Sequence, residues 1–133
     1  MEREVRVAIN REPDIVVARQ RGRDMAVELG FSLGDLALIA TAISEITRNV
    51  IEYATRGEMI VRVVQKGTRR GVEIIVEDEG PGIANLQQAM QDGYSTGGGL
   101  GLGLPGARRL MDEFAIDSTP GRGTRVVMRK WSK

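Results

Sequence analysis

A glycine-rich segment from Thr96 to Gly106 could bind phosphate groups. It reads TGGGLGLGLPG, carries no charge and runs into a stretch with helical periodicity. Backbone N–H groups without side chains, followed by the partial positive charge of a helix N-terminus, form an anion site without a cationic side chain. The segment lacks the Gly-Lys-Ser or Gly-Lys-Thr of a Walker loop. We therefore predict a phosphate-binding lid; a flexible glycine loop without a ligand is the alternative.

Asp78 lies at the exit of an apolar stretch and is followed by the turn residues Gly80, Pro81 and Gly82. Glycine allows a sharp turn and a close approach of a ligand to the backbone. The Asp78 carboxylate is placed to leave the sheet and meet a hydrogen-bond donor, and the exocyclic amine of a purine would fit. A plain Asp-x-Gly turn between a strand and a helix is the alternative. This motif therefore indicates a ligand site only in combination with the other motifs of the chain.

Glu45 and Asn49 are polar residues one helical turn apart in a mostly apolar stretch. Apolar residues recur on both sides of this helix, which predicts that it is covered on two faces. Polar groups in such a covered groove need partners. The alternative is a solvent-exposed Glu and an Asn that bonds locally to its own helix.

The composition excludes several classes of function. The chain has 133 residues, 41% of them apolar and 28% charged, which predicts one globular domain over residues 1–133. The net charge is +1 with basic residues scattered, so we expect no nucleic-acid partner. Without cysteine or histidine, thiolate and imidazole sites are excluded, and proton transfer must use a carboxylate or a lysine. No apolar run reaches the about 18 residues of a membrane span and no secretory segment is seen, so we expect no membrane contact and a cytoplasmic location.

Apolar periodicity and turn signals predict the elements that position these residues. Ser32 is a candidate N-cap, Gly30 a helix stop, and residues 120–123 a hairpin turn. Strands are expected over Val5–Ile9, Met59–Val64, Val72–Val76, Phe114–Ser118 and Thr124–Trp131, and helices over Pro13–Leu29, Leu36–Ala54, Ala84–Gln91 and Leu104–Phe114. Together they predict an α+β fold, a two-layer α/β sandwich with a mixed, largely antiparallel sheet and helices on one face.

Four motifs in this order resemble the ATP-binding fold shared by gyrase, the heat-shock chaperone of ninety kilodaltons, histidine kinases and MutL. They are Glu45–Asn49, Asp78–Gly82, Gly99–Gly103 and Gly121–Thr124, and the resemblance covers nearly the whole chain. The small size and the absence of histidine argue against a complete histidine kinase. Further segments look like those of the stressosome switch kinases, a group of small serine kinases: Ala18–Gln20, Thr41–Glu45, Gly80–Ile83, Asp92–Thr96, Leu104–Gly106 and Arg109–Phe114.

This resemblance implies the cofactors ATP and Mg²⁺, serine phosphorylation of STAS-domain proteins, and binding and activation of a PP2C-type phosphatase after release. It implies that Asp78 recognises the adenine amino group, that Asn49 supplies one oxygen to Mg²⁺, and that Glu45 orients or deprotonates the incoming serine hydroxyl. The nucleotide-binding residues that it implies are Asn49, Asp78, Gly80, Gly82, Ile83, Thr96, Gly97, Gly98, Gly99, Leu100, Gly101, Leu102, Gly103 and Thr124.

The chain departs from the pattern of related kinases in the glycine-rich lid. Related anti-sigma-factor kinases place an arginine in the lid, whereas Thr96–Ala107 contains no charge. The cation that neutralises the transferring phosphoryl group could be Arg48, Arg108, Arg109 or an arginine of the partner, and the sequence does not decide between them.

Two other classes of function also stay open. They are an anti-sigma factor kinase that sequesters a sigma subunit, and a non-catalytic ATP-binding adaptor.

Overall fold

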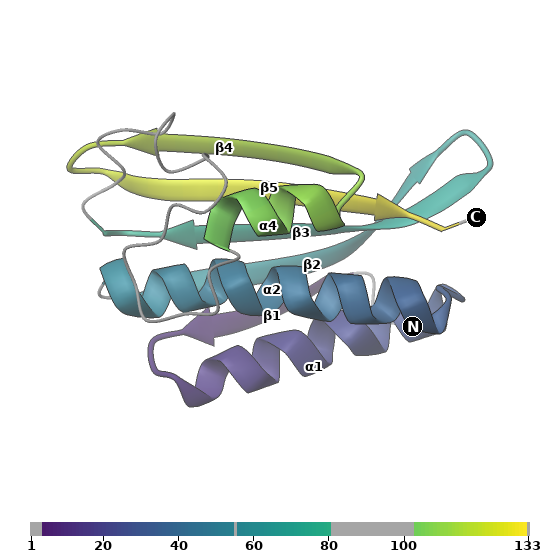
Figure 1. Ribbon diagram of the computed structural model, residues 1–133, viewed down its shortest axis with the longest axis horizontal. Helices are drawn as coiled ribbons and strands as arrows, with labels where there is room; N and C mark the ends of the chain where they lie inside the picture. The colour runs from purple at the N-terminus through teal and green to yellow at the C-terminus, as the bar shows by residue number, and fades with distance from the viewer. Residues whose placement is uncertain (1–3, 55, 81–102, 133) are drawn as a thin grey trace.

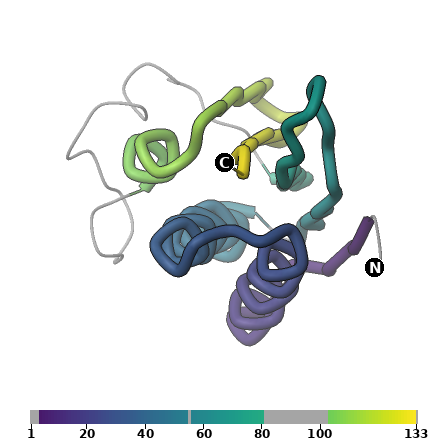
Figure 2. The backbone as a smooth tube through the Cα atoms, turned by 90° about the vertical axis from the view of Figure 1, so that its right-hand side faces the viewer, coloured from purple at the N-terminus to yellow at the C-terminus, as the bar shows by residue number. Residues whose placement is uncertain are grey.

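The computed structural model describes residues 4–54, 56–80 and 103–132. Within these residues, five strands form one sheet in the order β1-β2-β3-β5-β4, and every neighbouring pair is antiparallel. Helices α1, α2 and α4 lie on one face of the sheet (Figures 1 and 2). The elements are β1 Glu4–Ile9, α1 Pro13–Glu28, α2 Leu33–Tyr53, β2 Gly57–Lys66, β3 Arg69–Asp78, α4 Gly103–Leu110, β4 Glu113–Thr119 and β5 Gly123–Trp131. The predicted α+β two-layer sandwich is confirmed.

The predicted start of the first helix and the predicted N-cap of the second are confirmed, but α2 begins at Leu33, three residues before its predicted start. Pro13 begins α1, and the Asp14 carboxylate accepts the backbone N–H groups of Asn10 and Arg11 at 2.9 and 3.0 Å. These hydrogen bonds hold the pKa of Asp14 below its ordinary value. Gly30 follows α1 with a φ of 81°. The Ser32 side chain then caps α2 by accepting the N–H of Asp35 at 3.1 Å.

Helix α2 is covered on two sides, as its sequence predicts. It packs against α1 on one side and α4 on another (Figure 2). Its buried residues are Leu36, Ile39, Ala42, Ile43, Ser44, Glu45, Ile46, Thr47 and Val50. The buried hydroxyl of Thr47 donates to the Ile43 carbonyl oxygen at 2.7 Å. Because α2 is enclosed, Glu45 is brought into the interior, where it needs hydrogen-bond partners.

The predicted helix over Leu104–Phe114 is too long. Helix α4 ends at Leu110, and Phe114 lies in strand β4. Two contacts stop the helix: Lys130 Nζ donates to the Leu110 carbonyl oxygen at 2.8 Å, and the N–H of Asp112 donates to the Arg129 carbonyl oxygen at 3.0 Å. Strand pairing with β5 therefore overrides the helical periodicity of this stretch. The predicted helix over Ala84–Gln91 lies outside the described residues.

The first hairpin is longer than its sequence predicts. Strand β2 runs on to Lys66 and β3 starts at Arg69, so the turn holds only Gly67 and Thr68. Gly67 has a φ of 62°, which favours glycine in a tight hairpin turn. The polar ends of both strands pair across this hairpin, although their sequences lack the apolar alternation that marks a strand.

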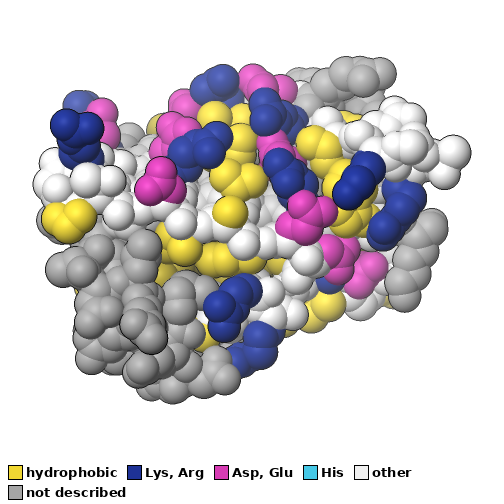
Figure 3. Space-filling model, turned by 90° about the horizontal axis from the view of Figure 1, so that it is seen from above, with side chains coloured by type: hydrophobic (Ala, Val, Ile, Leu, Met, Phe, Trp, Pro, Cys, Tyr) yellow, Lys and Arg dark blue, Asp and Glu magenta, His cyan; other side chains and the backbone are white. Residues whose placement is uncertain are grey.

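The helix-free face of the sheet carries a row of ion pairs. Glu73 of β3, only 2% exposed, accepts Arg62 Nε of β2 at 2.5 Å and Arg129 Nε of β5 at 2.6 Å. Arg129 also donates to Glu113 of β4 at 2.9 Å. Figure 3, viewed from above, shows basic and acidic side chains interleaved around hydrophobic ones. Burial opposes the charge of Glu73, but the hydrogen bonds from Arg129 and Arg62 outweigh it and hold the pKa of Glu73 below its ordinary value of 4.5.

Replacing Glu73 by Gln should destabilise the protein at neutral pH by about 1–3 kcal/mol, because two charged hydrogen bonds to a buried acceptor are lost. The folded-state pKa is lowered, so the stabilisation is present above pH 4.5 and is lost as the pH falls through the folded-state value. The loss should be measured by urea unfolding at pH 7 and at pH 3, and it should shrink at pH 3.

Glu77 provides the matched control for this measurement. It lies on the same strand and face as Glu73 and accepts Arg125 Nε at 2.9 Å, but both side chains are about half exposed, 49% and 52%. Glu77→Gln should therefore change the free energy of unfolding by less than about 1 kcal/mol. Equal losses for the two variants would show that burial does not set the strength of the Glu73 pairs.

Candidate functional site

Among the residues that the structure describes, two donors hold the Glu45 side chain. Its side chain is 7% exposed and accepts Arg48 Nη1 on Oε1 at 3.1 Å. Its Oε2 accepts the backbone N–H of Gly103, the first residue of α4, at 3.2 Å. Carboxylates are stabilised at a helix N-terminus by its partial positive charge. Glu45 is thus a buried carboxylate with both oxygens engaged, and it faces the start of the helix that follows the glycine-rich segment.

Asp78 is held at the exit of β3. Its Oδ1 accepts the N–H of Gly80 at 2.9 Å, which closes a turn, and the N–H of Thr124 on β5 at 3.2 Å. The Thr124 hydroxyl lies 2.8 Å from that of Ser118 on β4. Gly123 has a φ of 104°, and a Cβ there would lie 2.1 Å from the Asp78 carbonyl oxygen, so only glycine lets the strands approach here. The carboxylate is therefore fixed by one backbone donor of the turn that follows β3 and one of strand β5.

The exit turn of β3 meets the end of α2. A Cβ on Gly80 would lie 2.7 Å from the Cβ of Ala54 and 3.0 Å from the Tyr53 carbonyl oxygen, so the turn packs directly on the end of α2. Glu45 and Asn49 precede this end on the same helix, and Asn49 is half-buried. The C-terminal half of α2 thus has the Asp78 turn at its end and the start of α4 against its side (Figure 1).

The structure describes six of the predicted site residues, namely Glu45, Asn49, Asp78, Gly80, Gly103 and Thr124. The others lie outside the described residues: Gly82, Ile83, Thr96, Gly97, Gly98, Gly99, Leu100, Gly101 and Leu102.

Two contacts made by site residues were not predicted from the sequence. The bond between Glu45 and Gly103 joins residues 58 positions apart and has no local signal. The bond between Ser118 and Thr124 could have been found by pairing the strands across the turn at residues 120–123.

The described donors and acceptors fit a nucleotide better than a metal cluster. Asp78 offers a fixed carboxylate to an amino group, and the start of α4 offers backbone N–H groups to an anion. Among residues 4–54, 56–80 and 103–132, no group of three or more acidic side chains could hold a metal ion. Asn49 alone supplies one neutral oxygen, so a bound Mg²⁺ would need oxygens from the nucleotide and water.

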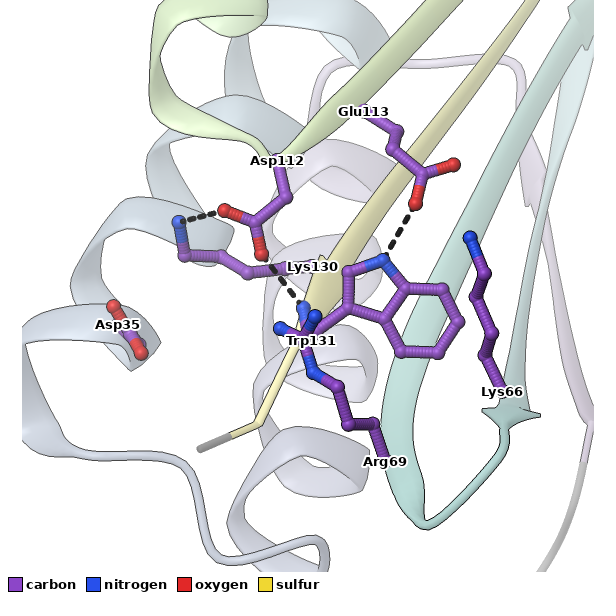
Figure 4. A pocket seen from close by; sticks show the side chains of 7 residues that line it. All are labelled: Asp35, Lys66, Arg69, Asp112, Glu113, Lys130 and Trp131. Carbon is purple, nitrogen blue, oxygen red and sulfur yellow. Dashed lines mark hydrogen bonds and ion pairs between the residues drawn. The ribbon is translucent and has the colours of Figure 1, made fainter.

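A hollow of about 630 Å³ lies at the other end of the sheet (Figure 4). It is lined by Asp35, Lys66, Arg69, Asp112, Glu113, Lys130 and Trp131. Glu113 accepts Trp131 Nε1 at 2.6 Å, and the hydrogen bonds from Trp131 and Arg129 hold the pKa of Glu113 below its ordinary value. Asp112 accepts the Trp131 N–H at 2.8 Å. This hollow shares no residue with the predicted site, and its contacts hold β4 and β5 together.

The fold is that of a family of ATPases. The family of histidine kinase-, DNA gyrase B- and HSP90-like ATPases matches residues 34–132, and the chain belongs to this family. A crystal structure of the RsbU and RsbW domains of Rv1364c from Mycobacterium tuberculosis has the same fold, with a TM-score of 0.70 and 21% identity over 99% of this chain and 33% of that chain. Within the described residues, no helix is long and apolar enough to cross a membrane.

Curated relatives narrow the class of enzyme. The chain is 51% identical over 125 residues to the serine/threonine-protein kinase RsbT of Bacillus subtilis, with 94% of each chain covered. It is 33% identical over 108 residues to an anti-sigma F factor of Clostridium novyi, with 77% of this chain and 76% of that protein covered. The expected resemblance to small switch kinases is confirmed, and the chain is an enzyme of the serine/threonine-protein kinase class.

Proposed function

We propose that this kinase transfers the γ-phosphoryl group of ATP to serine or threonine of STAS-domain proteins of the RsbS and RsbR type. After release it would bind and activate a PP2C-type phosphatase of the RsbU type. The single observation that carries the proposal is a likeness of 51% identity to RsbT over 94% of both chains. The fixed carboxylates of Glu45, on α2, and of Asp78, in the turn at the end of α2, support it.

Each described site residue has a proposed role. Glu45 would accept the proton of the incoming serine hydroxyl, a role worth about a hundred- to ten-thousand-fold in rate. Asp78 would accept a hydrogen bond from the adenine amino group, and Thr124 would line the base pocket with Gly82. The segment from Gly97 to Gly103 would close over the phosphates. Mg²⁺ held by Asn49 and the triphosphate would supply neutralising charge.

The proposed function is tested by incubating the purified chain with ATP, Mg²⁺ and a STAS-domain protein. Mass spectrometry should find a mass increase of one phosphoryl group on a serine or threonine of the STAS-domain protein. The same reaction without the chain is the control. ATP binding without any transfer would contradict the proposal and favour a non-catalytic ATP-binding adaptor.

A second candidate function is that of an anti-sigma factor kinase, because anti-sigma F factors match at 33% identity. The two candidate functions differ in the partner protein that the chain should bind. A pull-down with immobilised chain and ATP, offered a STAS-domain protein, a PP2C-type phosphatase and a sigma subunit, distinguishes them. Retention of the sigma subunit alone would reject the switch-kinase proposal.

Asn49→Asp should change the metal dependence of phosphoryl transfer. A second negative oxygen at this position should bind a divalent cation more tightly, because ligand charge sets the affinity of hard-cation sites. The half-saturating Mg²⁺ concentration should fall about tenfold, equal to about 1.4 kcal/mol. Asn10→Asp makes the same chemical change at an exposed position between β1 and α1 and should leave the curve unchanged. Superimposable Mg²⁺ and Mn²⁺ titrations of Asn49→Asp and the natural chain would remove Asn49 from the metal site.

A further inference from the structure

Arg48 is a cation of α2 whose side chain is already engaged. Its Nη1 lies 3.1 Å from Glu45 Oε1, three residues earlier on the same helix. The Arg48 side chain is 33% exposed, whereas that of Glu45 is 7% exposed. The Arg48 side chain therefore reaches from the protein surface to the buried carboxylate of Glu45. Such a position gives a fixed donor to a group that has lost most of its water.

Two donors of different origin define the direction of the Glu45 carboxylate. Arg48 binds Oε1 from the same helix, and the N–H of Gly103 binds Oε2 from the start of α4. A carboxylate held at both oxygens cannot rotate freely about its terminal bond. Removal of Arg48 would leave Oε1 without this donor and would free the group to turn about the remaining bond to Gly103.

We propose that Arg48 is a positioning residue for phosphoryl transfer, which acts by orienting the Glu45 carboxylate toward the start of α4. The inference rests on the proposed function, in which Glu45 receives the proton of the serine hydroxyl. It also assigns one of the arginines that the sequence left open: Arg48 serves Glu45 and does not contact the transferring phosphoryl group. Misplacement of a catalytic group by about 1 Å can lower the rate by about a hundredfold.

The exposed pair of Arg125 and Glu77 provides a matched control. It joins the same two residue types at 2.9 Å, but it lies on the helix-free face with both side chains about half exposed, 52% and 49%. An arginine that matters only through general surface charge would behave the same at both positions. If Arg48 orients a buried carboxylate, its replacement should lower kcat, whereas replacement of Arg125 should not.

The test compares Arg48→Met, Arg48→Lys and Arg125→Met in the full chain, with ATP and a STAS-domain protein. For Arg48→Met, kcat should fall by about tenfold or more, while the calorimetric Kd for ATP and the Tm stay close to those of the natural chain. Arg48→Lys keeps a charged donor of similar length and should recover most of the lost kcat. Arg125→Met should keep the full kcat.

Three outcomes would overturn the inference: a kcat within about twofold of the natural chain for Arg48→Met, a loss of ATP affinity in place of kcat, or no recovery with Arg48→Lys. The hydrogen bond is checked separately by NMR. Rotation of the Arg48 guanidinium should be slow in the natural chain and fast in Glu45→Ala; fast rotation in both would also overturn it. If the natural chain transfers no phosphoryl group, the proposed function fails, and the NMR result still decides whether Arg48 orients Glu45.

Discussion

Glu45→Ala should lower phosphoryl transfer to a STAS-domain protein by about a hundred- to ten-thousand-fold while ATP binding stays within about twofold. The reason is that, in the proposed function, the carboxylate acts on the hydroxyl of the protein substrate and not on the nucleotide. Glu45 is buried on α2 and faces the start of α4, and its two oxygens accept hydrogen bonds from Arg48 and Gly103. Transfer should be measured as the initial rate of phosphoserine formation, and binding by calorimetry.

Two further variants separate chemistry from structure at this position. Glu45→Gln keeps an oxygen that can accept the N–H of Gly103 but cannot take a proton, so its rate should fall as far as that of Glu45→Ala. Glu52→Ala removes an exposed carboxylate from the same helix and should leave the rate unchanged. Substantial transfer by Glu45→Gln would mean that this carboxylate orients the substrate without accepting its proton.

Asp78→Asn should weaken ATP binding by about 1–3 kcal/mol, which is about a five- to 150-fold rise in Kd. The natural carboxylate presents only acceptors, and its Oδ1 already takes the N–H groups of Gly80 and Thr124. The substituted amide keeps one oxygen for these bonds, but its NH₂ group would face the adenine amino group, donor against donor. Calorimetric titration with ATP and Mg²⁺ gives the Kd.

Glu79→Gln is the matched control for Asp78→Asn. Glu79 follows one residue later and pairs with Arg56 at 2.7 Å, but both side chains are 69% exposed. Its neutralisation should leave the Kd for ATP unchanged. An unaltered Kd for Asp78→Asn, with a Tm equal to that of the natural chain, would remove Asp78 from base recognition.

Local sequence signals correctly predicted the helices that position the site residues. The apolar stripe of α2, the Ser32 cap and the Gly30 stop all depend on contacts within a few residues. Helix propensity and capping act at that range, so a single sequence contains them. The burial of Glu45 followed from apolar residues on two sides of the helix, although its partners did not.

Contacts between distant segments could not be predicted in the same way. The helix over Leu104–Phe114 was predicted too long because pairing with β5 takes the residues after Leu110 into β4. The bond from Gly103 to Glu45 depends on how α4 packs against α2. Such choices are made by tertiary pairing, which overrides local propensity and leaves no periodic pattern.

The position of Trp131 has a practical consequence for spectroscopy. It is the one tryptophan of the chain, its ring has the Arg69 guanidinium 5.7 Å from its centroid, and it pairs with Gly71 on β3. Asp78 lies seven positions after Gly71 on β3, a distance of about 23 Å along the strand. Intrinsic fluorescence should therefore be insensitive to nucleotide occupancy and sensitive to melting of the sheet. A ligand that stabilises the protein can then be quantified from the shift of an emission-monitored denaturation midpoint, without correction for quenching by the ligand itself.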